Sequence, residues 1–111
     1  MLAIYAHDNK LTSLPQSLSE LSKLEIIRFD NNYISEFPIQ LLNLKNLTYI
    51  DFSKTDVAIL PKEIVDYQKL ELLVFDGYRI DTADPLNENY DSVMKQLHER
   101  GVILNVTNEA P

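Results

Sequence analysis

The sequence has 111 residues, the size of one domain, and carries a formal net charge of −7 at neutral pH. That charge argues against a nucleic-acid partner, because binding to phosphate groups requires clustered Lys and Arg side chains. There is no cysteine and no apolar run of about 18 residues, which excludes a disulfide framework, a cysteine-based metal site and a membrane-spanning helix.

Residues 1–10, MLAIYAHDNK, contain neither a basic start nor a long apolar stretch. They therefore do not resemble a secretory signal peptide. We expect a cytoplasmic protein that does not bind membranes, and a secreted effector is the alternative that stays open.

Four segments beginning at residues 1, 24, 47 and 70 align with one another at a spacing of 23 residues. Agreement over many columns in register indicates an internal repeat. The apolar columns are Met1, Leu24, Leu47 and Leu70; Ile4, Ile27, Ile50 and Leu73; Ala6, Phe29, Phe52 and Phe75; Leu11, Ile34, Val57 and Ile80; and Leu14, Phe37 and Leu60. Two further columns hold Asn9, Asn32, Thr55 and Tyr78, and Pro15, Pro38 and Pro61.

Each segment opens with a stretch that has the alternation of a β-strand, as in LEIIRF at residues 24–29. Ile27 and Phe29 would point to one side of this strand, and Ile26 and Arg28 to the other. Strands that recur every 23 residues need a crossover that returns each strand beside the previous one. The sequence therefore predicts a stack of parallel strands in which each strand pairs only with its neighbours.

The columns that follow the strands have separate physical roles. The amide of Asn32 can donate and accept, so we expect it to bond the backbone of the turn and of the adjacent coil. Proline fixes φ and lacks a donor, which suits the start of the returning helical turn. Phe29, Phe52 and Phe75 are expected to stack as an internal aromatic column.

The repeat pattern stops after Ile80, and an amphipathic helix over about residues 87–100 is predicted next. Asn87 or Asn89 can cap its start and Gly101 its end. The alternating stretch VILNV then predicts a last strand over about residues 102–106. The face of the helix that would pack on the repeats carries Tyr90, Val93, Met94 and Leu97.

The repeated unit LxxLxLxxNxLxxLPxxLxxLxx resembles the leucine-rich repeat, in the 23-residue kind that contains Leu-Pro and occurs in bacterial and intracellular proteins. The clearest copies are residues 24–46 and 47–69. The resemblance implies an α/β fold, a right-handed solenoid with a parallel sheet of about five strands on its concave face. It also implies one structural domain, with repeats over 1–82 and a helix-plus-strand cap over 83–111, in a protein that binds other proteins without catalysis.

Period two places a set of side chains on the concave sheet face, which is the usual binding surface of such repeats. We expect Tyr5, Arg28 and Tyr49 to be the anchors of an interface. The alternative is that the apolar members serve cross-strand pairing and the aspartates bond backbone at the turns. The candidate residues are Tyr5, His7, Ile26, Arg28, Asp30, Tyr49, Asp51, Leu72, Val74 and Asp76.

We expect no catalysis, no cofactor and no metal. His7 lies beside Asp8, but no serine is placed as a nucleophile, and Ser53 is two repeats away. The segment DTADPLN has oxygens at a spacing suggestive of a calcium site, with Asp81, Asp84 and Asn87, but a capping loop is the favoured interpretation.

Two alternatives to a self-contained binding module stay open. The chain is a targeting or scaffold fragment of a larger, effector-like repeat protein, or it self-associates through an uncapped N-terminal edge. That edge would expose Leu2, Ile4 and Leu11 around an unpaired strand.

Overall fold

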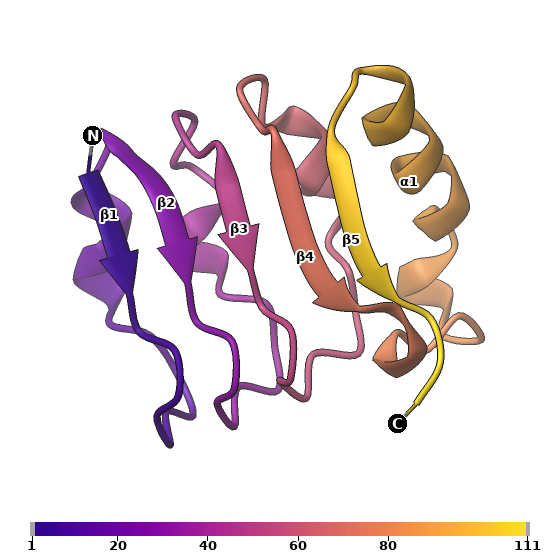
Figure 1. Cartoon of the computed structure of the whole chain (residues 1–111), viewed down its shortest axis with the longest axis horizontal. Coiled ribbons are helices and arrows are strands. Elements are labelled where there is room, and N and C mark those ends of the chain that lie inside the picture. The colour runs from indigo at the N-terminus through magenta and orange to yellow at the C-terminus, as the bar shows by residue number, and fades with distance from the viewer. Residues whose placement is uncertain (1, 111) are drawn as a thin grey trace.

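A computed structural model describes residues 2–110 and contains one parallel sheet of five strands in the order β1-β2-β3-β4-β5. Figure 1 shows the strands side by side in chain order, with the helical segments together on one side of the sheet. The parallel sheet of about five strands that the repeat predicts is thereby confirmed. The strands are β1 (Leu2–Tyr5), β2 (Leu24–Arg28), β3 (Tyr49–Asp51), β4 (Leu72–Asp76) and β5 (Ile103–Thr107).

Short 3-10 helices return the chain from the end of one strand to the start of the next. Pro15, Pro38 and Pro61 each stand directly before one of these helices, and their carbonyls accept the first bonds of the turn. The predicted role of the proline column is thereby confirmed. The helical segments are η1 (Gln16–Glu20), η2 (Ile39–Leu41), η3 (Lys62–Asp66), η4 (Gly77–Arg79), η5 (Pro85–Asn87) and α1 (Tyr90–Glu99).

Equivalent residues of successive repeats pair across the sheet, at a spacing of 23 residues from β1 to β4. Ile4, Ile27, Ile50, Leu73 and Leu104 form one row of partners. Ile27, Ile50 and Leu73 are fully buried under the helical turns, whereas the residues on either side of them in each strand face the opposite direction. The alternation of side chains predicted for the strands is therefore correct.

An aromatic column runs through the core at right angles to the strands. Phe29 and Phe52 stack with ring centroids 5.9 Å apart, and Phe52 and Phe75 stack at 5.1 Å. Phe37 meets the edges of the first two rings, and Tyr90 of α1 meets Phe75 edge-on. Offset stacked and edge-to-face pairs are the geometries that aromatic rings prefer, so the column connects three repeats to the cap.

Asn32 bonds backbone in the way predicted for it. Its amide nitrogen lies 2.9 Å from the carbonyl of Ala6 in the preceding repeat and 3.0 Å from that of Phe29. Its oxygen accepts a hydrogen bond from the backbone N–H of Leu11. In the next repeat Thr55 occupies the same column, and its hydroxyl donates to the carbonyl of Phe52 at 2.7 Å.

The backbone takes a left-handed conformation once after each of the first three strands, at Asp8, Asn31 and Lys54, with φ of 58°, 55° and 53°. Asp and Asn tolerate this region better than other residues that have a Cβ. The N–H of Lys54 donates to the carboxylate of Asp76 at 2.7 Å, which holds the turn in place.

The cap differs from its prediction at the start of the helix. The chain forms η5 first and α1 only from Tyr90, because the carboxylate of Asp84 accepts from the N–H of Leu86 and starts a separate turn. Asn89 occupies the N-cap position of α1 as expected, but its side chain makes no capping hydrogen bond. At the other end Gly101 has φ of 84°, as expected for a residue that ends a helix.

Helix α1 packs Val93 and Leu97 into the core. Arg100, just after the helix, donates to the carbonyls of Val65 and Tyr67 at the end of η3. Within residues 2–110, no helix has both the length and the apolar character that crossing a bilayer requires.

Candidate functional site

The candidate site is the open sheet face, defined as the side chains of β1–β5 that point away from the helical turns. Cross-strand pairing arranges them in columns that match the predicted ones. The first column is Ala3, Ile26, Tyr49, Leu72 and Ile103. The second is Tyr5, Arg28, Asp51, Val74 and Asn105. His7, Asp30, Ser53 and Asp76 follow at the ends of the strands.

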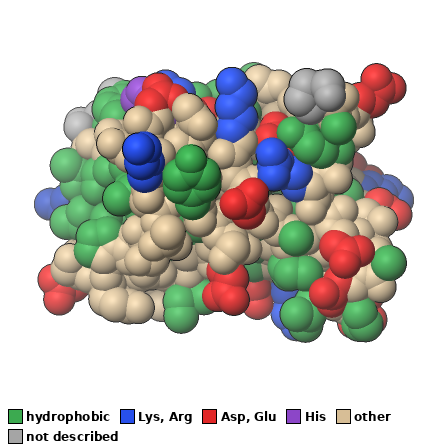
Figure 2. Space-filling view, turned by 90° about the horizontal axis from the view of Figure 1, so that it is seen from below, with side chains coloured by type: hydrophobic (Ala, Val, Ile, Leu, Met, Phe, Trp, Pro, Cys, Tyr) green, Lys and Arg blue, Asp and Glu red, His purple; other side chains and the backbone are tan. Residues whose placement is uncertain are grey.

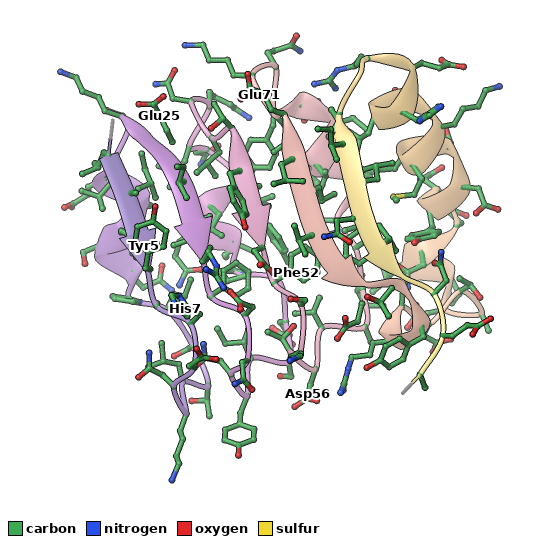
Figure 3. All side chains as sticks on the ribbon, viewed as in Figure 1. Tyr5, His7, Glu25, Phe52, Asp56 and Glu71 are labelled. Atoms are coloured by element: carbon green, nitrogen blue, oxygen red, sulfur yellow. The ribbon has the colours of Figure 1, made fainter. Side chains whose placement is uncertain are left out.

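Apolar side chains on the open sheet face are most accessible at its two ends. Tyr5 is 60% exposed on β1 and Ile103 is 65% exposed on β5. In between, Ile26, Tyr49 and Leu72 are half-buried against one another and their neighbours. Figure 3 shows Tyr5 and His7 on the β1 side, away from the core residue Phe52.

Arg28 occupies the middle of the open sheet face and is held by two carboxylates. Its Nε and one terminal nitrogen donate to Asp30 at 3.1 and 3.0 Å, and its Nε lies 3.7 Å from a carboxylate oxygen of Asp51. The hydrogen bonds to Asp30 raise the pKa of Arg28 above its ordinary value. Because its charge is already compensated, Arg28 offers a partner less free charge than its sequence position suggests.

The three aspartates of the candidate site are buried and bonded within the chain. Asp51 accepts from both the N–H and the hydroxyl of Ser53. Asp76 accepts from the N–H of Lys54 and lies 3.6 Å from Nε of Arg79. With Asp30 paired to Arg28, these carboxylates support the sheet and its turns instead of forming a free acidic rim.

His7 lies on the open sheet face next to Tyr5, with the ring centroids 6.2 Å apart and the planes at 87°. Its Nε2 is 3.9 Å from a carboxylate oxygen of Asp8, whereas its Nδ1 is buried and finds no hydrogen-bond partner among residues 2–110. Ser53, the nearest serine that the sequence suggested, donates its hydroxyl to Asp51 and not to a histidine. The absence of catalysis stays a prediction.

The edge of the molecule that carries the loops after the strands shows no patch of a single charge. Figure 2 views this edge and shows acidic, basic and apolar side chains interspersed. Arg79 pairs with Asp56 at 3.1 Å and lies over the ring of Tyr78 at 5.5 Å. Tyr33 is 61% exposed here, and it serves below as a control outside the open sheet face.

The segment DTADPLN works as a capping loop. Asp81 and Asp84 each accept a bond from a backbone N–H two residues further on. Asn87 is buried and bonds the carbonyls of Ala58 and Asp81, and it accepts from the N–H of Leu60. Within residues 2–110, no group of three His, Asp or Glu side chains is placed to hold a metal ion.

The burial of Asp51 should make the free energy of unfolding depend on pH. Burial raises the pKa of this carboxyl above its ordinary value of 3.8, so the folded chain keeps a proton that the unfolded chain has already released. The contribution of Asp51 to the free energy of unfolding should therefore fall as pH rises from about 3.8 through the folded-state pKa. Asp51→Asn has no carboxyl at this position, so its free energy of unfolding should lack this decrease with pH. Urea unfolding at pH values between about 4 and 7 measures the effect.

The matched comparison is the difference in unfolding free energy between Asp51→Asn and the native sequence at each pH. As pH rises, the unfolding free energy of the variant should increase relative to that of the native sequence, because the two proteins share all other titrating groups. A difference that is constant over this range would contradict the assignment to Asp51.

Five parallel strands joined by helical turns, with equivalent residues of four units 23 apart, define a leucine-rich repeat solenoid. Among solved structures, a leucine-rich repeat protein from Leptospira interrogans is similar, with a TM-score of 0.75 and 25% sequence identity over 95% of this chain. The chain spans about a quarter of the length of that protein, since the match covers 25% of it. No protein-family model and no curated protein matches the sequence.

Proposed function

We propose that the chain is a protein-binding module without catalysis, and that the open sheet face contacts the partner. The observation that carries the proposal is that no helical segment of residues 2–110 covers this face, which presents ordered side chains from five consecutive strands (Figure 1). Extended sheet faces of stacked repeats are common binding surfaces. The similarity to a leucine-rich repeat protein supports an interaction module in general terms.

Tyr5 and Tyr49 are the anchors that we favour. A tyrosine buries a large area with few rotatable bonds, so it contributes strongly when a partner removes it from water. Tyr5 is well exposed on β1, and Tyr49 is half-buried on β3. Burial raises the pKa of the Tyr49 hydroxyl. Arg28 is better regarded as a support for the face, because Asp30 and Asp51 already hold it.

The first experiment identifies the partner and the face together. A photo-crosslinking phenylalanine analogue in place of Tyr5 should capture the partner in the source cells, whereas the same analogue in place of Tyr33 should not. The two tyrosines are 60% and 61% exposed, which makes the second position a matched control. Capture from Tyr33 alone would move the interface to the loop edge and contradict the proposal.

With the captured partner in hand, we expect Tyr5→Ser to weaken binding by roughly 1–2 kcal/mol, because an exposed aromatic contact is lost. Isothermal titration calorimetry against the native chain and Tyr33→Ser measures the effect. Unchanged affinity of Tyr5→Ser would remove Tyr5 from the interface.

Self-association is a second candidate because, within the residues described, β1 pairs with a strand on one side only, and its first residue, Leu2, is exposed. An unpaired strand edge can add a strand from another copy. Analytical ultracentrifugation of the native chain and of Leu2→Lys tests this idea. A monomer at all concentrations in both samples would exclude it.

A location in the cytoplasm and a place within a larger, effector-like repeat protein remain part of the proposal. The match to about a quarter of the Leptospira protein is compatible with the second of these. Immunoblotting of cell fractions with an antibody to this chain would measure both the compartment and the size of the parent protein.

A further inference from the structure

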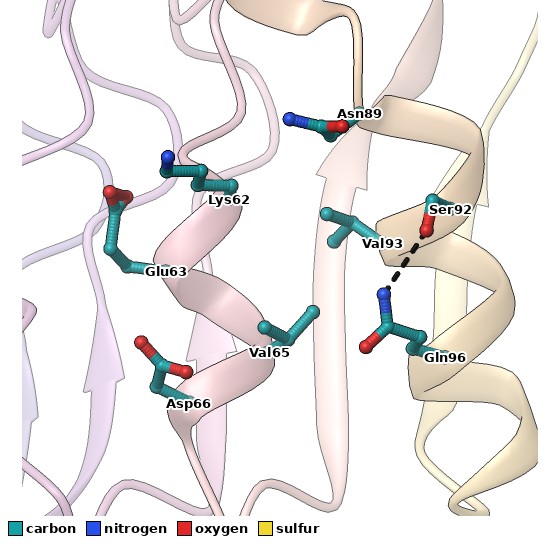
Figure 4. Close-up of a pocket in the computed structure, with 8 residues that line it drawn as sticks. All are labelled: Lys62, Glu63, Val65, Asp66, Asn89, Ser92, Val93 and Gln96. Carbon is teal, nitrogen blue, oxygen red and sulfur yellow. Dashed lines mark hydrogen bonds between the residues drawn. The ribbon is translucent and has the colours of Figure 1, made fainter.

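A groove lies on the helical side of the molecule, between the last full repeat and the cap. It has a volume of about 310 Å³ and is bounded by η3 and α1. Figure 4 shows Val65 of η3 and Val93 of α1 approaching each other from the two walls. Ser92 and Gln96 line the α1 wall with polar groups, and a hydrogen bond of 3.1 Å joins them. We call this depression the cap groove.

A second depression, of about 240 Å³, has a mainly apolar lining. Phe37, Ile59, Pro61 and Leu86 line it, and we call it the apolar pocket. Pro61 directly precedes Lys62, the first residue of η3, so the chain passes from the lining of the apolar pocket to the lining of the cap groove within two residues. Leu86 of η5 is 74% exposed and lines the apolar pocket.

The linings of the two depressions carry more acidic than basic side chains. Glu36 lines the apolar pocket, and Lys62 is the one basic residue among those that line the cap groove. Glu63 and Asp66 line the η3 side of the cap groove. Within the described part of the chain, neither carboxylate forms a salt bridge, so both are available to a cation.

We propose that the cap groove and the apolar pocket together bind a basic, leucine-bearing segment of a partner protein. A large apolar side chain of the segment would enter the apolar pocket beside Leu86. The aliphatic part of a Lys or Arg would lie over Val65 and Val93, with its charged group close to Glu63 and Asp66. Complementary charge would speed the encounter and orient the segment.

This surface is separate from the open sheet face, because η3 and α1 lie on the other side of the sheet (Figure 1). The inference therefore does not rest on the proposed function, and each can fail without the other. A module with both surfaces could connect two proteins.

Fluorescence anisotropy with a labelled synthetic peptide of repeated Arg-Leu-Ser triplets tests the inference on the whole chain. We expect saturable binding that weakens with added salt, and a loss of at least about tenfold in affinity for the double variant Glu63→Lys with Asp66→Lys. Leu86→Ser should also weaken binding, by about threefold to tenfold, because one apolar contact is lost. Circular dichroism confirms that each variant is folded.

Two controls locate the bound peptide. Tyr5→Ser, on the open sheet face, should bind it with native affinity, and a peptide in which glutamate replaces every arginine should not bind. Absence of binding up to about 1 mM would overturn the inference. Equal affinity for the native chain and the Glu63→Lys, Asp66→Lys variant, or loss of affinity in Tyr5→Ser, would also overturn it.

Discussion

Replacing Phe52 with alanine is expected to lower the free energy of unfolding by about 3–5 kcal/mol, a large part of the stability of a domain of this size. Phe52 is the middle ring of the aromatic column and stacks on Phe29 at 5.9 Å and on Phe75 at 5.1 Å. Its ring also makes a T-shaped contact with Phe37, with the ring centroids 5.4 Å apart. Urea unfolding followed by far-UV circular dichroism measures the loss.

The conservative variant Phe52→Leu separates the loss of volume from the loss of aromatic contact. It keeps most of the apolar volume, so its cost should be smaller, at about 1–2 kcal/mol. A cost below about 1 kcal/mol for Phe52→Ala would show that the neighbouring repeats collapse into the space and that the column is not rigid.

Asn32→Ala is expected to cost about 2–5 kcal/mol, because it removes a side chain that bonds buried and part-buried backbone groups. The N–H of Leu11 loses its acceptor and the carbonyl of Phe29 loses a donor, whereas the carbonyl of Ala6 keeps its hydrogen bond from Asn9. Asn9 is the equivalent residue one repeat earlier and is exposed, with bonds to two nearby carbonyls only. Asn9→Ala is therefore the matched control and should cost less than about 1 kcal/mol.

The variant Asn32→Asp distinguishes the donor role from the acceptor role. Aspartate can still accept from Leu11, but its carboxylate would face the carbonyl oxygens of Ala6 and Phe29. We expect it to be at least as destabilising as Asn32→Ala. Equal costs for Asn32→Ala and Asn9→Ala in chemical unfolding would contradict the role assigned to the buried amide.

Much of the fold could be predicted because the same pattern of residue types recurs in successive repeats. The proline column locates the helical turns, and the phenylalanine column locates the interior, since one position in four units has to satisfy the same neighbours. Thr55 could be interpreted in the same way, because it stands in the column of Asn32 and still offers a side chain that bonds backbone.

The cap was predicted less well, because it has no second copy with which to compare it. Asn87 was expected to cap a helix, yet it bonds Ala58 and Leu60 of the preceding repeat, much as Asn32 bonds its own preceding repeat. Asn87 lies nine residues beyond Tyr78, the residue that the 23-residue spacing places in the column of Asn32, and the alignment therefore hides its role.

The candidate site was predicted in outline only. Strand alternation placed Tyr5 and Arg28 on the same face correctly, because period two is a property of the backbone. The pairing of Arg28 with Asp30 and Asp51 depends on side-chain rotamers and on the distance between strands, and neither is visible in a single sequence. The cap groove escaped prediction for a similar reason, since η3 and α1 bring together residues about thirty positions apart.

The strict neighbour-to-neighbour order of the strands has a consequence for the history of such a chain. Each strand bonds only to strands of adjoining units, so duplication of one complete unit would lengthen the sheet without exposing its interior. The binding surfaces on the two sides would respond differently to such an event. The open sheet face would gain area by one strand, whereas the cap groove would keep its shape, because it is made by the junction of the final unit with α1.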